Sequence, residues 1–380
     1  MEQNQTALRD TPIEFTGSGK EYFGIWIVNI LLTIVTLGVY SAWAKVRTRK
    51  YFYNNTRIDG SVFDYHANPV AILKGWAIVV LILLLQQVLV RINVLYGLGM
   101  ILLILAFVPW AMVRSRVFNL INTSYRNVRF HFDRDYKGLY VIFLTAPLPI
   151  IIGYGMMIYF SYTAQLEGRQ PPTDLIGVAG LVMLVGVVFI PFFIYRFYRF
   201  IISHSAYGKT YFESGFKAGN FYMIYFKAFG LTLMLVAILI VTMFFVVGAT
   251  HGNENKDVAA FLLTLPVMLI YLFGILYIRY FIEASKLNTI WSKTTISTHR
   301  FSSRLKPLGF LWVVLLNTIL IIVSFGLYIP WAKVRMTRYR LDKLVLQVDG
   351  ELDNFAAKER EQMGALGAEL GDAMDFVISL

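Results

Sequence analysis

The residues best suited to bind a ligand are aromatic rings and cations that occur twice at the same spacing. Trp43-Ala44-Lys45-Val46-Arg47 recurs near the C-terminus as Trp331-Ala332-Lys333-Val334-Arg335. An indole ring prefers the headgroup layer of a membrane, and each nearby cation attracts anionic headgroups by ~1 kcal/mol. Membrane orientation alone explains the same cations. The candidate headgroup or interface contacts are therefore Trp43, Lys45, Arg47, Trp331, Lys333 and Arg335.

Uncharged polar side chains within apolar stretches are the second set of candidates. Asn29 and Asn317 occupy equivalent positions in the two copies of the repeat, and Gln86 and Gln87 lie in another apolar stretch. We take all four as candidate buried polar residues. Hydrogen bonding between helices, typically ~0.6 to 2 kcal/mol per contact, explains them better than a ligand site does.

Signatures of catalysis are absent from the sequence. The chain has no cysteine, which excludes thiolate metal sites and cysteine nucleophiles. It contains no phosphate-binding P-loop, no G-x-S-x-G and no H-E-x-x-H. Four histidines fall in polar loops without the i, i+4 spacing of metal ligands, which favours ordinary loop histidines over a metal site: His66, His131, His204 and His299. We expect no catalytic residues, no metal, no cofactor and no enzymatic activity.

The composition indicates a membrane protein. Of 380 residues 57% are hydrophobic and 15% are charged, whereas a soluble domain carries about 25% charged residues. Eight apolar stretches are long enough to cross a bilayer: Tyr22–Ala42, Val70–Val90, Leu95–Val113, Leu139–Phe160, Leu175–Tyr195, Tyr222–Val247, Val258–Ile278 and Leu308–Pro330. The net charge of +12 sits beside these stretches, which points to lipid headgroups and not to nucleic acid as the partner.

Alternate loops hold most of the cations. The loops after the first, third, fifth and seventh stretches are basic, whereas the intervening loops contain only Arg91, Arg169 and Lys256. Basic loops remain on the cytoplasmic side, so these loops face the cytoplasm.

Short elements with the pattern of a β-hairpin follow the apolar stretches. Asp59-Gly60, for example, is a turn dipeptide between β-prone residues. The five elements are Arg57–Phe63, Tyr125–Phe132, Tyr207–Phe212, Thr294–Phe301 and Leu346–Leu352. We infer about five related units, each a membrane segment followed by a cytoplasmic hairpin. The predicted fold class is an all-α transmembrane bundle of about six to eight helices with short cytoplasmic β-hairpin elements and internal repeats.

Eight crossings conflict with the charge pattern. They would place the cations after Trp331 outside, against the positive-inside tendency. A helix break at Gly38 and Gly326 would instead make the two most similar stretches re-entrant or interfacial, leaving six crossings and two cytoplasmic termini. The alternative is eight crossings with both termini outside.

Three runs of residues resemble a known family. Gly19–Gly24, Thr36–Arg47 and the Asp59-Gly60 turn with Phe63 are similar to the YjgN-like family of bacterial inner-membrane proteins. The resemblance covers about residues 13 to 350. It implies a multi-pass protein of the bacterial inner membrane and brings no established activity or catalytic residue.

The chain divides into three predicted parts and leaves two functions open. Residues 1–21 form an N-terminal segment, 22–345 a membrane domain of helix-plus-hairpin units, and 346–380 a hairpin remnant with a polar tail. One function is that of a transporter, channel or lipid-handling protein of unknown substrate. The alternative is a non-catalytic scaffold that presents a cytoplasmic docking platform to an unknown protein partner.

Overall fold

Ten short strands close into one antiparallel barrel. The computed structural model describes residues 8–145, 148–250 and 256–363. The strands are β1 (Arg9–Phe15), β2 (Thr56–Ile58), β3 (Ser61–Tyr65), β4 (Thr123–Tyr125), β5 (Val128–Phe132), β6 (Ser205–Tyr207), β7 (Thr210–Ser214), β8 (Thr294–Ile296), β9 (His299–Ser303) and β10 (Leu344–Val348). They pair in sequence order from β1 to β9, β10 follows β9, and β10 also pairs with β1 to complete the ring. The predicted all-α bundle is therefore wrong, because the polar elements build one barrel and not separate hairpins.

Four hairpins form where the sequence predicts them. Asp59 and Gly60 turn β2 into β3 with φ of 49° and 74°, and Arg126 and Asn127 turn β4 into β5 with φ of 47° and 63°. Two successive residues in the left-handed region give a turn whose twist matches the strands it joins.

The fifth predicted hairpin is a single strand, which was not foreseen. β10 pairs with β1, as when Arg9 faces Val348 and Pro12 faces Val345. β1 lies in the N-terminal segment to which the sequence assigned no element. The first and last strands of the chain thus complete the barrel together.

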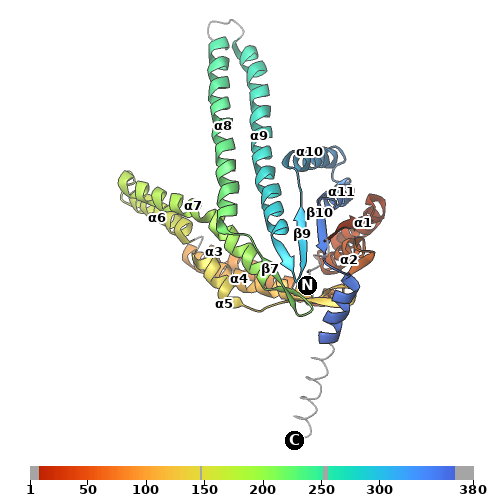
Figure 1. Ribbon diagram of the computed structural model, residues 1–380. Helices are drawn as coiled ribbons and strands as arrows, with labels where there is room; N and C mark the ends of the chain where they lie inside the picture. The colour runs from red at the N-terminus through yellow and green to blue at the C-terminus, as the bar shows by residue number, and fades with distance from the viewer. Residues whose placement is uncertain (1–7, 146–147, 251–255, 364–380) are drawn as a thin grey trace, which may run out of the picture.

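The helices leave the barrel in pairs. They are α1 (Gly19–Val35), α2 (Ser41–Asn54), α3 (Pro69–Ile92), α4 (Val94–Ile121), α5 (Tyr136–Thr145), α6 (Leu148–Leu166), α7 (Thr173–Ser203), α8 (Ala218–Thr250), α9 (Lys256–Ser292), α10 (Pro307–Val323) and α11 (Ile329–Leu341). A further helix spans residues 352–363. The paired helices join the strands at one end of the barrel, its helix end, and the hairpin turns lie at the other, its turn end (Figure 1).

Five described helices are long and apolar enough to cross a membrane. They lie at Pro69–Ile92, Gly99–Ile121, Thr173–Ser203, Ala218–Ala249 and Leu263–Ser292. α5 and α6 pass the same test as a pair bent by 46°, which raises the number to six. The predicted stretches Tyr22–Ala42 and Leu308–Pro330 are not continuous helices.

Both of those stretches break at the predicted glycines. Between α1 and α2 the φ angles of Leu37 and Gly38 are 49° and 93°, and Phe325 and Gly326 repeat them at 50° and 90° between α10 and α11. A preceding hydroxyl holds each turn. Thr36 Oγ1 accepts the Tyr40 N–H, and Ser324 Oγ accepts the Tyr328 N–H, both at 2.9 Å. Each helix pair therefore turns back on itself.

Candidate functional site

Phenylalanines from four strands form an aromatic belt inside the barrel. Phe63, Phe130, Phe212 and Phe301 come from β3, β5, β7 and β9. Their ring centroids are 6.3, 6.5 and 6.4 Å apart in order around the barrel. The spacing is even because each phenylalanine occupies the same inward-facing position in its hairpin, and side chains alternate faces along a strand.

A second ring of residues faces the belt across the strand pairs. Tyr125 pairs with Phe63, Tyr207 with Phe130, Ile296 with Phe212, and Leu346 with Phe301. Ile58 opposite Ile13 completes the ring. Both rings together make the inner wall apolar.

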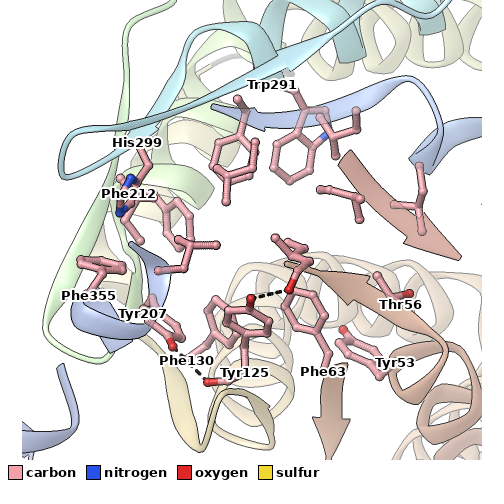
Figure 2. Close-up of a pocket in the computed structure, with 18 of the residues that line it drawn as sticks. Tyr53, Thr56, Phe63, Tyr125, Phe130, Tyr207, Phe212, Trp291, His299 and Phe355 are labelled. Atoms are coloured by element: carbon pink, nitrogen blue, oxygen red, sulfur yellow. Dashed lines mark hydrogen bonds between the residues drawn. The ribbon is translucent and has the colours of Figure 1, made fainter. Parts of the chain in front are cut away.

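The two tyrosine hydroxyls in this wall are satisfied by the barrel itself. Tyr125 Oη donates to the Ile58 carbonyl at 2.7 Å, and Tyr207 Oη donates to the Tyr125 carbonyl at 3.0 Å (Figure 2). Burial raises the pKa of both phenols, so they stay neutral at physiological pH. Neither hydroxyl needs a polar ligand.

The barrel encloses a cavity of about 480 Å³, which we call the lumen. Sites for small ligands commonly occupy ~300 to 1,000 Å³ and are lined by apolar and aromatic side chains. Figure 2 shows the labelled rings of Phe63, Phe130, Phe212 and Trp291 around this space. The lumen therefore suits an apolar ligand.

The helix of residues 352–363 covers the turn end of the lumen. Leu352 and Phe355 line the lumen from this helix. Glu359 is 1% exposed, and its carboxylate accepts the Lys209 N–H at 2.7 Å and the Thr210 hydroxyl at 2.6 Å. These bonds tie the helix to the β6–β7 turn.

Two more turns hold the segment around this helix. Arg126 in the β4–β5 turn binds Asp59 at 3.0 Å and also pairs with Asp353. His299 at the start of β9 accepts the Asp349 N–H through Nδ1 at 3.1 Å. The lumen is thus a pocket covered at one end.

At the helix end the lumen borders a second cavity. Phe52 and Tyr53 of α2, Trp291 of α9, and Thr337 and Leu341 of α11 line the lumen here. Phe52 and Thr337 also line a cleft of about 510 Å³ between α10 and α11, together with Asn317 and Lys333. The side chains of Phe52 and Thr337 therefore separate the lumen from this cleft, which we call the C-terminal cleft.

Asn29 and Asn317, both predicted to be buried, are each 5% exposed. Asn29 Nδ2 donates to the Ala44 carbonyl at 3.5 Å, and Asn317 Nδ2 donates to the Ala332 carbonyl at 3.4 Å. The Oδ1 atom of each amide is buried without a hydrogen-bond partner. The two amides thus bridge equivalent helix pairs and each leaves an acceptor free.

The structure brings part of the predicted set together. Asn29, Lys45 and Lys333 line one cleft of about 480 Å³, which we call the N-terminal cleft. Gln86 is half-buried and Gln87 exposed on α3, away from the three cavities described so far.

The remaining predicted interface residues lie outside these cavities. Trp43 stacks on Tyr40 at 6.2 Å, and Trp331 stacks on Tyr328 at 5.8 Å. Arg47 and Arg335 are exposed. Of the four histidines predicted in loops, His131 lies in β5 and His299 in β9. No three of the described His, Asp or Glu residues form a metal-ligand cluster.

The sequence analysis missed the aromatic belt, although a signal for it exists. Each belt phenylalanine is the third residue after the second turn residue, as Phe63 is after Gly60 and Phe130 after Asn127. The sequence analysis treated each hairpin separately and therefore did not predict that the hairpins enclose a common interior.

Comparison with known proteins decides the family. A model of bacterial proteins of unknown function, DUF898, matches residues 10–373. The chain belongs to this family. It is 25% identical to inner membrane protein YjgN of Escherichia coli strain K12 over 368 residues, with 92% of this chain and 91% of the relative covered. YjgN of Salmonella typhimurium strain LT2 is 24% identical over 364 residues with the same coverage.

The family assignment confirms the resemblance seen in the sequence and the predicted location. This DUF898 member is a multi-pass protein of the bacterial inner membrane, with membrane-capable helices on one end of its barrel. No solved structure matches the chain.

Proposed function

We propose that this protein binds a phospholipid of the inner membrane and holds an acyl chain in the barrel lumen. The observation that carries the proposal is an uncharged, aromatic-lined lumen next to the helix ends that join the barrel strands. An acyl chain that leaves the bilayer for the lumen stays out of water, whereas exposing it to water would cost ~0.8 kcal/mol per methylene group. Residues 352–363 cover the far end of the lumen, so the lumen is a pocket and not an open path through the barrel.

The barrel also supports a topology with six crossings. All ten strands share one barrel and must lie on one side of the membrane, so every helix pair between them returns to that side. α2 and α11 are too basic to cross, since a lysine or arginine at the bilayer centre costs ~2.5 to 3.5 kcal/mol. We therefore place α1–α2 and α10–α11 as re-entrant pairs. α3, α4, α5–α6, α7, α8 and α9 then cross.

This topology places the barrel in the cytoplasm, because the basic residues lie on its side of the helices. The alternative of eight crossings would separate β1 from β2 by a bilayer, although the two strands pair through Ile13 and Ile58. The recurring order of helix pair and hairpin further supports five related units, the last completed by β10 and β1.

Photo-crosslinking tests the lipid-binding function. Purified protein is exchanged with phospholipid carrying a diazirine near the end of one acyl chain, irradiated and mapped by mass spectrometry. We expect crosslinks in the β4–β5 and β6–β7 hairpins, which contain Tyr125, Phe130 and Phe212. Crosslinks confined to the apolar helices would overturn the proposal and favour the docking scaffold.

A matched pair of variants sharpens the crosslinking test. Thr337→Trp places an indole where α11 lines the lumen, and Arg335→Trp places it on the same helix away from the lumen. Thr337→Trp is expected to remove most hairpin crosslinks, and Arg335→Trp to retain them. Equal loss in both variants would count against the lumen as the binding site.

A further inference from the structure

The N-terminal cleft has the composition of an anion site. Lys45 and Arg49 of α2 line it together with Lys333 of α11, and no carboxylate is among its lining residues. Lys333 also lies over the Tyr22 ring, with Nζ 5.9 Å from the ring centroid. Cations from opposite ends of the chain therefore meet where α1 packs against α11.

Two of these cations are free to bind a ligand. Arg49 donates to Tyr65 Oη at 2.7 Å and also bonds to Asn119 Oδ1, so it is held in place. In the part of the chain that the structure describes, no carboxylate forms an ion pair with Lys45 or Lys333.

Asn29 adds an acceptor to the same cleft. Its side chain lines the cleft and its buried Oδ1 has no partner. A buried acceptor without a partner is costly, and a ligand that brings a hydroxyl hydrogen would satisfy it. The cleft therefore offers cations and a hydrogen-bond acceptor to one ligand.

The helices α2 and α11 connect the cations of the N-terminal cleft to the lumen. On α11, Lys333, Thr337 and Leu341 are one helical turn apart, about 6 Å per step, and the last two line the lumen. On α2, Lys45 and Arg49 line the cleft, and Tyr53, a further turn along, lines the lumen. A headgroup at the lysines thus lies two turns or fewer from the mouth of the lumen.

We propose that the N-terminal cleft binds a phosphate that carries a neighbouring hydroxyl group, as in a glycerol phosphate. Lys45 and Lys333 hold the phosphate, and Asn29 Oδ1 accepts the hydroxyl hydrogen. The inference that this phosphate belongs to the lipid in the lumen rests on the proposed function. Binding of the phosphate itself does not depend on it.

Native mass spectrometry of the full-length protein in detergent tests this site. Phosphatidylglycerol is titrated against phosphatidylcholine, whose headgroup is zwitterionic and has no hydroxyl. We expect at least tenfold preference for phosphatidylglycerol, and loss of most of that preference in Lys45→Met with Lys333→Met. Equal binding of the two lipids by the unmodified protein would overturn the proposal.

Matched variants separate the cleft from general surface charge. Arg47→Met with Arg335→Met removes two cations from the same helices that are exposed like Lys45 and Lys333 but do not line the cleft. This control is expected to keep the preference, and an equal loss would show surface attraction only. Lys45→Arg with Lys333→Arg is expected to restore binding, which excludes a folding defect as the cause.

Free glycerol 3-phosphate distinguishes the source of the phosphate. Failure to compete with phosphatidylglycerol at a thousandfold excess supports a membrane lipid as ligand, whereas displacement supports a soluble phosphate ester in the same cleft. If the headgroup preference is absent while acyl crosslinks persist in the hairpins, the lumen function survives and the cleft proposal alone fails.

Discussion

Asn29 and Asn317 make the same contact at opposite ends of the chain. Each amide nitrogen donates to the carbonyl of an alanine fifteen residues later, and each Oδ1 stays buried without a partner. The same turn follows each of them, with φ angles that agree within a few degrees. The two helix pairs therefore share both the turn and the amide contact.

Replacing Asn317 tests whether its amide stabilises the folded protein. A hydrogen bond of 3.4 Å contributes little, and the unpaired oxygen costs ~1 to 3 kcal/mol. We expect Asn317→Leu to leave the free energy of unfolding unchanged within about 1 kcal/mol or to raise it. Thermal melts in detergent measure this, with Thr318→Leu in the same cleft as control. A loss above 2 kcal/mol specific to Asn317→Leu would show a structural clamp.

Glu359 is expected to hold the C-terminal helix on the barrel. Its buried carboxylate accepts hydrogen bonds from Lys209 and Thr210, and bonds to a charged group contribute ~1.5 to 3 kcal/mol. Glu359→Ala should therefore weaken docking of residues 352–363 by about that amount. Limited proteolysis within this helix would measure it as a faster cleavage rate.

The control for Glu359 lies two residues further along the helix. Glu361 is exposed, so Glu361→Ala should leave the cleavage rate unchanged. If both substitutions accelerate cleavage equally, the contact of Glu359 with the β6–β7 turn is not what secures the helix.

Local features of this fold could be predicted from the sequence, and the barrel could not. Asp59-Gly60 specifies a hairpin through its own backbone preferences, and Gly38 permits a helix break in the same local way. Closure depends on Arg9 meeting Val348, a pairing that neither segment encodes alone. Asn29 and Asn317 could be predicted because they occupy the same position in two similar sequence segments. The lumen could not, because it forms only when distant residues such as Phe63 and Phe301 line one interior.

Acid should loosen the segment around the C-terminal helix through His299. Burial lowers the pKa of this imidazole, which Asp349 partly opposes, and the Phe355 ring lies 4.9 Å away. The folded form therefore prefers neutral histidine. The contribution of His299 to the folding free energy is fully present above the ordinary histidine pKa of ~6.5. It declines as the pH falls toward the lowered pKa of His299 in the folded protein.

Proteolysis of residues 352–363 at pH 7.5 and pH 5.5 measures the effect of His299. Cleavage is expected to accelerate at pH 5.5, and His299→Gln should reduce this dependence because glutamine does not titrate. His131, which is exposed on β5, provides the control as His131→Gln. A rate independent of pH in the unmodified protein would contradict the prediction.

Single cysteines in this cysteine-free chain test the six-crossing topology. Leu37 and Phe325, at the tips of the re-entrant pairs, are 91% and 98% exposed, which is suited to contact with lipid. In intact cells we expect an impermeant maleimide to label Gln170→Cys between α6 and α7, but not Ser61→Cys, Leu37→Cys or Phe325→Cys.

Permeabilised cells complete the topology test. Ser61→Cys in the β3 strand should become reactive when the cytoplasm is opened, whereas Leu37→Cys and Phe325→Cys should stay unreactive until detergent removes the bilayer. The reason is that a maleimide needs water around the thiolate, and hydrocarbon excludes it. Labelling of Leu37→Cys from outside intact cells would mean that α1 reaches the periplasm. α2 would then have to return through the bilayer with its four cations, and the re-entrant topology would be wrong.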